Sequence, residues 1–376
     1  MRILFITINN PFGVGGGDFA THAYLKAFSQ LSEGNVDVFM RDGIKVERTI
    51  LAHFHPVPER PVLARLWSVV TGHIHRNVKA VRQLLAKDAH YDYCVFNSSK
   101  VSPGLIDQVK SLGIKTITIH HNVEAEFVRD NTPNPMRRAI LIRLVMQAER
   151  KAYQMSDYNL FLTRQDMETF HRQYGENRSV KAVIGTFEFQ PLPVLKPKAV
   201  DTRHLTFAIT GTLCLQQGID GVKYFFEELY QYLPEGSQVI ISGRNPTSEV
   251  TALCGCHANV QLIPNPADMS EIINKADIYI CPTRLGGGLK LRVMDGLRLG
   301  IPVITHVCAA RGYEALVGDN CLSMFSDQQE FASGLRKLVA DIQRGAIQRN
   351  LIRQKYEEIF PQEAGFDRLR LILPSR

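Results

Sequence analysis

The chain has 376 residues, 45% of them hydrophobic and 22% charged, and carries a formal net charge of +7. This composition is that of a globular protein and excludes a disordered or fibrous chain, and the length indicates two domains. No apolar run reaches the roughly 18 residues that a transmembrane helix needs, and residues 1–8 lead into a strand rather than a signal peptide. We therefore expect a cytoplasmic protein.

The cysteines favour the same compartment. There are seven of them, an odd number without regular spacing, which is typical of free thiols rather than a disulfide framework. Cys254, Cys256 and His257 form the only local cluster of metal-ligand residue types. Because a zinc site needs four ligands and no second Cys/His pair lies at motif spacing, the sequence predicts no metal centre. It also predicts no bound cofactor.

The first half of the chain alternates strands with helices. Strands are predicted at residues 3–8, 37–40, 93–97, 116–120 and 158–162, and helices at residues 18–31, 64–85, 102–112 and 135–155. Such alternation is typical of a parallel sheet covered by helices. This half therefore predicts a first domain over residues 1–187.

The second half repeats this pattern after a proline-rich interruption, which predicts an interdomain linker at residues 188–203. Strands are predicted at 205–209, 238–242, 260–263, 278–281 and 303–305, and helical stretches at 328–344 and 351–372. The fold class is therefore α/β with two doubly wound, Rossmann-like domains, the second over residues 204–361. Two such domains facing each other place ligands at the carboxyl ends of their strands, in the cleft between them.

The segment 276–303 carries the strongest functional signal. An apolar strand ends in a glycine-rich turn, and a helical pattern follows that stops at Gly300. The backbone N–H groups of Gly286, Gly287 and Gly288 are expected at a helix N-terminus, where anions bind. Lys290 and Arg292 fall in the predicted first helical turn, where cations oppose the helix dipole unless an anion is bound. The segment therefore predicts a phosphate site, the alternative being that both side chains only face solvent.

Two further loops of the second domain support this site. They read TGTLCLQQG at residues 210–218 and SGRNP at residues 242–246, and each follows a predicted strand. Their glycines permit close backbone approach, and the guanidinium of Arg244 suits a phosphate or a nucleobase edge. Together the three loops predict a nucleoside-diphosphate site. Its predicted donor-binding residues are Gly211, Thr212, Gly243, Arg244, Asn245, Gly286, Gly287, Gly288 and Leu289.

The first domain has two loops of interest. Gly15, Gly16 and Gly17 precede a helix with Asp18 as the expected N-cap, and they can approach a phosphate or an acceptor sugar. The spacing does not match the dinucleotide fingerprint, which argues against an oxidoreductase.

The second loop, HHNVEAE, follows the strand 116–120. Adjacent residues at a strand end face opposite sides, so one histidine is expected in the cleft and the other behind the sheet. The sequence does not settle which, and we favour His121 over His120 as the functional one. Asn122 and Glu124 are expected beside it.

Two stretches alternate basic and apolar residues at helical spacing, residues 60–82 and 136–151. Either could lie on an anionic membrane surface. Ordinary amphipathic helices with a solvated basic face explain the pattern equally well. No motif points to nucleic acid.

Taken together, the loops resemble those of the GT-B-fold glycosyltransferases, in particular the retaining nucleotide-sugar group often called family four. The resemblance covers the glycines 15–17, the HNVE segment 121–124, the SGRNP turn and the segment 276–305. In the last, Lys290, Arg292 and Asp295 occupy the basic, basic and acidic positions of the family pattern. Gly287 stands where the family usually has a first glutamate, and Thr212 and Gln217 stand where it has a basic pair.

The resemblance implies metal-independent, retaining transfer of a sugar from a nucleoside-diphosphate donor to a hydroxyl acceptor on a glycan, a lipid-linked or a cell-envelope saccharide. Lys290 and Arg292 would then stabilise the leaving diphosphate, His121 would contact the donor sugar and Asp295 the ribose. It also implies that residues 362–376 pack back on the first domain, and that the protein works in the cytoplasm, peripherally at the inner face of the plasma membrane. The alternatives are a nucleotide-sugar 2-epimerase and a non-catalytic scaffold that keeps the same fold.

Overall fold

The computed structural model describes residues 1–13, 15–47, 49–58, 78–101, 103–188, 192–194, 201–318 and 320–373. The chain divides into two units, each built on one parallel sheet. Unit 1 comprises Met1–Phe189 with Gln362–Arg376, and unit 2 comprises Gln190–Pro361. Parts of the expected linker 188–203 and of the basic stretch 60–82 lie outside the described residues.

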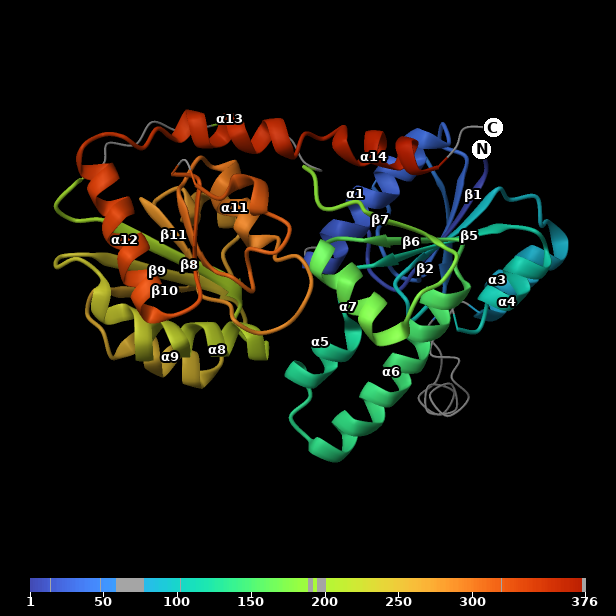
Figure 1. The fold of residues 1–376 in the computed structure, drawn as a ribbon, viewed down its shortest axis with the longest axis horizontal. Helices are drawn as coiled ribbons and strands as arrows, with labels where there is room; N and C mark the ends of the chain where they lie inside the picture. Colours follow the sequence, from blue (N-terminus) through green and yellow to red (C-terminus); the bar gives the residue numbers. More distant parts are fainter. Residues whose placement is uncertain are drawn as a thin grey trace. The chain divides into compact units, whose positions relative to one another are not determined.

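Unit 1 contains a seven-stranded sheet in the order β3-β2-β1-β4-β5-β6-β7 among the described residues (Figure 1). Its strands are β1 (Ile3–Thr7), β2 (Val36–Arg41), β3 (His53–Val57), β4 (Tyr93–Asn97), β5 (Lys115–His120), β6 (Tyr158–Phe161) and β7 (Val180–Val183). Its helices are α1 (Gly16–Leu31), α3 (Val78–Lys87), α4 (Ile106–Ser111), α5 (Glu124–Asn131), α6 (Pro135–Met155), α7 (Arg164–Tyr174) and α14 (Ala364–Ile372). The strand order reverses direction between β1 and β4, so ligand-binding loops are expected after these strands.

Unit 2 contains a six-stranded parallel sheet in the order β10-β9-β8-β11-β12-β13. Its strands are β8 (Thr206–Thr212), β9 (Gln238–Arg244), β10 (Val260–Pro264), β11 (Ile278–Cys281), β12 (Val303–His306) and β13 (Leu322–Phe325). Its helices are α8 (Gln216–Tyr224), η1 (Phe225–Leu229), η2 (Tyr230–Tyr232), α9 (Ser248–Gly255), α10 (Met269–Ile273), α11 (Arg292–Arg298), η3 (Glu314–Leu316), α12 (Gln328–Gln343) and α13 (Arg349–Ile359). Here the order reverses between β8 and β11.

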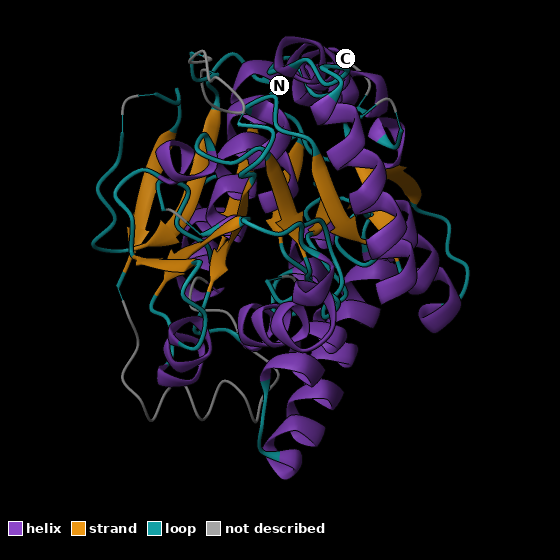
Figure 2. Ribbon diagram, turned by 90° about the vertical axis from the view of Figure 1, so that its left-hand side faces the viewer, coloured by secondary structure: helices purple, strands orange, loops and turns teal. Residues whose placement is uncertain are grey.

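Helices cover both faces of the second sheet. Alternate residues of a strand point to opposite faces, and here both sets are apolar and buried. Phe207 and Ile209 of β8 belong to one apolar cluster with residues of α8, α9 and α12. Ala208, between them, belongs to a second cluster with residues of α11 and α13. Figure 2 shows strands flanked by helices in this way. Burial on both faces explains why the strands read as nearly continuous apolar runs.

Helix α14 completes unit 1 by packing beside α1 (Figure 1). Arg368 of α14 donates from Nη1 to the carbonyl oxygens of Ile184, at 2.6 Å, and Thr186, at 2.7 Å. The hydroxyl of Tyr24 in α1 donates to the carbonyl oxygen between them, that of Gly185. The loop that follows β7 is therefore held by both helices.

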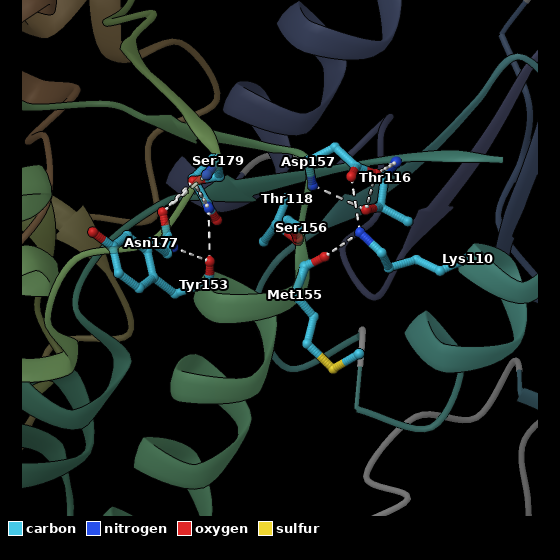
Figure 3. A network of polar contacts seen from close by, with 10 residues as sticks. Lys110, Thr116, Thr118, Tyr153, Met155, Ser156, Asp157, Asn177 and Ser179 are labelled. Carbon is cyan, nitrogen blue, oxygen red and sulfur yellow. Dashed lines mark hydrogen bonds and ion pairs between the residues drawn. The ribbon is translucent and has the colours of Figure 1, made fainter. Parts of the chain in front are cut away.

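A polar network ties together the amino ends of β5 and β6 (Figure 3). The carboxylate of Asp157 accepts hydrogen bonds from the backbone N–H and the hydroxyl of Thr116, each at 2.8 Å. Lys110 donates to the same carboxylate and to the carbonyl of Met155, also at 2.8 Å. These contacts lower the pKa of Asp157 despite its partial burial. The network lies at the opposite end of the strands from the loops that carry the candidate site.

The predicted fold class, α/β with two parallel sheets, is confirmed. The predicted ranges 93–97, 135–155 and 278–281 coincide with β4, α6 and β11. The pattern missed β3, β7, β13, α5 and α7. The edge strands β3 and β7 have no fully apolar face, since most of their residues are half-buried or exposed. The helical stretch expected at 351–372 is interrupted between α13 and α14, and α4 begins at Ile106 rather than at residue 102.

Across the described part of the chain, no helix is long and apolar enough to cross a membrane.

Candidate functional site

In unit 2, the predicted loops meet where β8 and β9 end. Gly211 pairs with Gly243 and Thr212 with Arg244 in the register of these strands. The N–H of Leu213 then donates to the carbonyl oxygen of Arg244 at 2.9 Å, so the two loops leave the sheet side by side. A side chain at Gly243 is excluded, because its Cβ would lie 1.9 Å from the carbonyl oxygen of Gly211. Asn245 follows with a φ of 48°, and its N–H donates to Asn265.

The glycine loop after β11 lies against the start of α8. Gly286 has a φ of 80°, and a Cβ built on it would lie 2.0 Å from Nε2 of Gln217 and 3.3 Å from Nζ of Lys290. The amide of Gln217 and the ammonium of Lys290 therefore meet at the α-carbon of Gly286. The sequence did not predict a role for Gln217, which was named only because it stands where the family has a basic residue. In the structure its side chain lies next to the predicted phosphate loop.

Lys290 does not lie in a helical turn, which corrects the sequence-based expectation. Helix α11 begins at Arg292, so three residues, Leu289 to Leu291, separate the glycines from it. The Lys290 side chain is only 8% exposed and donates to the carbonyl oxygen of Gly287 at 2.7 Å. Its own carbonyl oxygen accepts from the hydroxyl of Tyr313 at 3.1 Å and from the backbone N–H of Val293 at 3.0 Å, directly before the helix. The buried ammonium is thus directed back onto the glycine loop.

Arg292 joins the same cluster from the first position of α11. Its Nη1 donates to the hydroxyl of Thr283 at 3.0 Å and lies 2.8 Å from the position of a Cβ built on Gly211. Gly211 and the glycine loop are therefore lined by two cationic side chains and one amide. Asp295, in the same helix turn, is half-buried and close to Tyr279 and Tyr313, whose pKa values are raised mainly by burial.

Arg284 anchors the start of this loop, a role that sequence reasoning missed. Its guanidinium makes two hydrogen bonds to the carboxylate of Asp220 in α8, at 3.0 and 3.1 Å. The guanidinium carbon also lies 4.4 Å from the ring centroid of Tyr224. A bidentate pair fixes orientation as well as distance. No sequence motif links Asp220 to Arg284, because they are 64 positions apart.

In unit 1, the glycines 15–17 lie at the N-terminus of α1, and the expected N-cap role of Asp18 is wrong. The N-cap is Gly15, and Asp18 is the third helical residue. Its carboxylate accepts from the backbone N–H of Gly15 at 3.1 Å and of Asn10 at 3.0 Å. A carboxylate in the first turn satisfies exposed N–H groups without itself being the cap. Gly16 and Gly17 are the first two helical residues.

The two histidines at the end of β5, His120 in the strand and His121 directly after it, lie in different surroundings. His120 is buried against the rings of Phe161 and Phe170, with its Nε2 at 2.8 Å from Oδ1 of Asn159. His121 is directed toward β4, where its Nε2 lies 2.7 Å from Oδ1 of Asn97. Burial lowers the pKa of both rings to about 4, so both are neutral at pH 7. The role of Asn97 was not foreseen from the sequence.

Glu124 begins α5 and is held by a buried acid. Its carboxylate pairs with Lys100 at 2.7 Å, and its backbone N–H donates to Oε1 of Glu149 at 2.7 Å. Glu149 is fully buried, accepts a second hydrogen bond from Tyr174 at 2.8 Å, and burial raises its pKa to about 7. Asn122, beside it, has a buried side-chain oxygen with no hydrogen-bond partner among the described residues.

No group of three or more His, Cys, Asp or Glu side chains among the described residues could hold a metal ion. His257, from the Cys/His cluster at 254–257, stacks on the ring of Phe226 at 4.7 Å.

Residues 205–341 match the family model described as "Glycosyl transferases group 1". A search of curated protein sequences finds no match. Among solved structures, sucrose-phosphate synthase of Thermosynechococcus elongatus is 13% identical over 99% of this chain and 98% of its own, with a TM-score of 0.74. HepE of Anabaena, in complex with UDP and glucose, is 14% identical over 100% of both chains, with a TM-score of 0.69. WaaG, a glycosyltransferase involved in lipopolysaccharide biosynthesis, is 17% identical over 99% and 100%, with a TM-score of 0.66.

Proposed function

Since this chain is a group 1 glycosyltransferase with the GT-B fold, we propose that it transfers a sugar from a nucleoside-diphosphate donor with retention of configuration and without a metal. The observation that carries this proposal is the meeting of Lys290, Arg292 and Gln217 at Gly211 and Gly286. UDP-sugars are the first donors to test, because HepE of Anabaena was solved with UDP and glucose and with UDP-glucose.

The unit 2 site suits a diphosphate leaving group. Breaking the bond between sugar and phosphate develops negative charge on the diphosphate, and preorganised donors in a buried site stabilise such charge strongly. Lys290 and Arg292 supply two positive charges, and Gln217 supplies a neutral N–H donor. Asp295, an acceptor close by in α11, is proposed to bind the ribose hydroxyls. Thr212, Arg244, Asn245 and Leu289 are proposed to complete the nucleotide site around these groups.

We assign the unit 1 loops to sugar hydroxyls. His121 is neutral and lies beside Asn122 and Glu124, and hydroxyl groups suit such a mixture of donors and acceptors. The glycine loop at residues 15–17 is proposed to lie near the acceptor saccharide.

An anionic membrane surface is the proposed place of action, in the reducing cytoplasm that suits seven free cysteines. Helix α6 carries five basic side chains, and its one acidic side chain, Glu149, is buried. In its first turns Met136 is 75% exposed and Ile140 is 56% exposed, next to the exposed Arg137 and Arg143. Apolar residues among arginines match the headgroup region of an anionic bilayer, which favours a lipid-linked or cell-envelope acceptor.

The test of the donor site is a thermal-shift series with nucleoside diphosphates and nucleotide sugars. A ligand that binds only the folded protein raises its melting temperature. We expect one nucleotide-sugar class to raise it in the wild type, and the double variant Lys290→Ala with Arg292→Ala to lose that shift. Lys223→Ala, at an exposed ion pair of α8, is the control that should retain it. If no nucleotide raises the melting temperature of the folded wild type, the non-catalytic scaffold becomes the better explanation.

A further inference from the structure

In unit 1 a chain of hydrogen bonds leads from the first turns of α1, by way of the end of β4, to His121. It runs from Gly17 through Thr21 and Asn97 to the imidazole. Carbonyl oxygens only accept hydrogen bonds, whereas hydroxyl and amide groups can do both. The direction of each bond in this chain can therefore be worked out from its one fixed end.

The fixed end is the carbonyl oxygen of Gly17. Thr21 lies 2.7 Å from it and must donate its only hydroxyl hydrogen there. The Thr21 oxygen then accepts from its other neighbours, which are the side-chain amides of Asn9 at 3.0 Å and Asn97 at 2.7 Å. The NH₂ group of Asn97 therefore faces Thr21. It also donates to the hydroxyl of Thr7 at 3.1 Å.

This orientation leaves one possibility for the other end of Asn97. Its Oδ1 faces Nε2 of His121 at 2.7 Å, and a carbonyl oxygen requires a hydrogen on that nitrogen. Because the ring is neutral, a hydrogen on Nε2 leaves Nδ1 with a lone pair. Nδ1 is buried and has no hydrogen-bond partner among the described residues. Such an atom is costly to leave unpaired.

We propose that Asn97 is a positioning residue that holds His121 in the Nε2–H tautomer, so that Nδ1 accepts a hydrogen bond from a hydroxyl group of the sugar substrate. The identity of this ligand rests on the proposed function, whereas the tautomer does not. A phosphate oxygen is excluded as the partner of Nδ1, because two acceptors would face each other. The glycine loop then contributes through the Gly17 carbonyl, which sets the direction of the whole chain of hydrogen bonds.

The groups around the His121 ring favour a neutral imidazole, whose Nδ1 can accept a hydrogen bond. Lys100 is the nearby positive charge, and together with the larger effect of burial it keeps the pKa of His121 low. Lys100 is itself paired with Glu124 at 2.7 Å. Tyr24 of α1 places its ring 6.0 Å from that of His121.

His120 offers an internal control on the neighbouring residue. Its Nε2 lies 2.8 Å from Oδ1 of Asn159, whose NH₂ donates to the carbonyl oxygen of Tyr153 at 2.9 Å. The same NH₂ group also donates to the hydroxyl of Ser179 at 2.8 Å. Figure 3 shows both Tyr153 and Ser179. By the same reasoning His120 is also an Nε2–H tautomer, but its position depends on β6 and not on Asn97. Its Nδ1 is likewise buried and without a partner among the described residues, but the His120 side chain is fully buried whereas His121 is half-buried and can be reached by a ligand.

The first test uses the unaltered protein and needs no substrate. Long-range ¹H–¹⁵N correlation spectra of histidine-labelled protein at pH 7 distinguish the two neutral tautomers and the charged ring. We expect His121 and His120 both to carry hydrogen on Nε2 alone. A hydrogen on Nδ1 of His121, in a neutral or charged ring, overturns the proposal.

The second test changes Asn97. In Asn97→Asp the new carboxylate can still accept a hydrogen bond from Nε2 of His121. Its negative charge raises the pKa of His121, so we expect Nδ1 to become protonated. The signals of His120 should not change. We expect kcat/KM for sugar transfer to fall about tenfold or more, since a donor replaces the acceptor that the hydroxyl needs. Unchanged His121 signals in the folded variant overturn the proposal. Thr21→Val and Thr21→Ser provide a second pair, in which only the variant with a hydroxyl should retain the wild-type His121 spectrum.

The ligand is tested by adding UDP or UDP-glucose to labelled wild type. We expect UDP-glucose, and not UDP, to shift the Nδ1 signal of His121. A shift with UDP alone would place the diphosphate at this nitrogen and overturn the hydroxyl assignment. If UDP-glucose binds, as judged by melting temperature, without shifting Nδ1, the ligand assignment is wrong. Failure of every nucleotide to bind would instead overturn the proposed function and leave the tautomer supported.

Discussion

Lys290 donates a hydrogen bond to the carbonyl oxygen of Gly287 over 2.7 Å, although its side chain is almost fully buried. The side chain is thus held against the loop that would contact an anion. Gly287 occupies the position in which the family pattern has a glutamate, and a carboxylate there would compete with the anion for this ammonium. Lys290 and Arg292 bring two positive charges close to Gly286 and Gly211, which leads to the first prediction.

Gln217→Glu should place a competing carboxylate beside Lys290. We expect the variant to be at least as stable as the wild type at low salt and to bind UDP about tenfold or more weakly, since its charge repels the diphosphate. Titration calorimetry at several salt concentrations measures the affinity for UDP, and thermal melting measures the stability. Gln216→Glu is the control, because it adds the same charge one residue earlier, on an exposed side chain. Equal loss of binding in the two variants would contradict this assignment.

Gly286→Ala should disturb the same loop through its shape. The new Cβ would lie 2.0 Å from Gln217, and the φ of 80° is one that alanine rarely adopts. We expect weaker UDP binding and a lower melting temperature. Gly255→Ala, where a Cβ meets nothing within 4 Å, should leave both unchanged. Calorimetric melting with and without UDP separates the loss of stability from the loss of binding.

Gly365→Ala should loosen α14. A Cβ at this position would lie 2.1 Å from the ring of Phe187, which is itself buried against Tyr24 at a centroid distance of 5.5 Å and cannot swing aside. We expect destabilisation of about 1–3 kcal/mol. Gly334→Ala in α12 has room at 3.4 Å and should be neutral or stabilising by up to about 1 kcal/mol. Urea unfolding measures both, and similar effects at the two glycines would argue against the packing of α14.

Glu149 should make unit 1 less stable as pH rises. Its pKa is about 7 in the folded protein and 4.5 in the unfolded chain, so the folded state holds this proton more tightly. The contribution is fully present below pH 4.5 and is lost as pH rises through 7, by up to about 3 kcal/mol. The depressed pKa values of His120 and His121 act in the opposite direction, with stability lost as pH falls from 6.5 to about 4.

Glu149→Gln isolates the contribution of the acid. Glutamine can still accept from the N–H of Glu124 but does not ionise, so the variant should lose less stability than wild type between pH 5 and pH 8. Urea unfolding across this range checks the difference. Parallel pH profiles for the two proteins would mean that Glu149 does not titrate in the folded state.

Helix α6 should bind anionic vesicles. We expect the protein to sediment with phosphatidylglycerol vesicles and much less with phosphatidylcholine vesicles, with binding weakened by salt. The double variant Met136→Ser with Ile140→Ser should lose this binding. Leu371→Ser removes an equally exposed apolar side chain, 89% exposed, from α14 and should bind as wild type. Loss of binding in Leu371→Ser alone would move the membrane contact away from α6.

Local sequence patterns predicted most of the sheet cores but not the contacts between distant residues. Strands such as Ile278–Cys281 are buried on both faces and read as apolar runs, whereas Val180–Val183 at a sheet edge has no such signal. Lys290 was expected in a helix because periodicity does not fix the residue at which a helix begins, which here is Arg292. The Asn97–His121 contact joins residues 24 positions apart and depends on strand order, which spacing alone does not give.

The segment that completes unit 1 is also the last described part of the chain to leave the ribosome. The segment Gln190–Pro361 is made before it and, at about 5–20 residues per second, takes roughly 10–35 s to synthesise. During that interval the carbonyl oxygens of Ile184 and Thr186 lack the Arg368 side chain, and α1 lacks its contact with α14. The first unit can therefore be completed only after the segment Gln190–Pro361 has been synthesised.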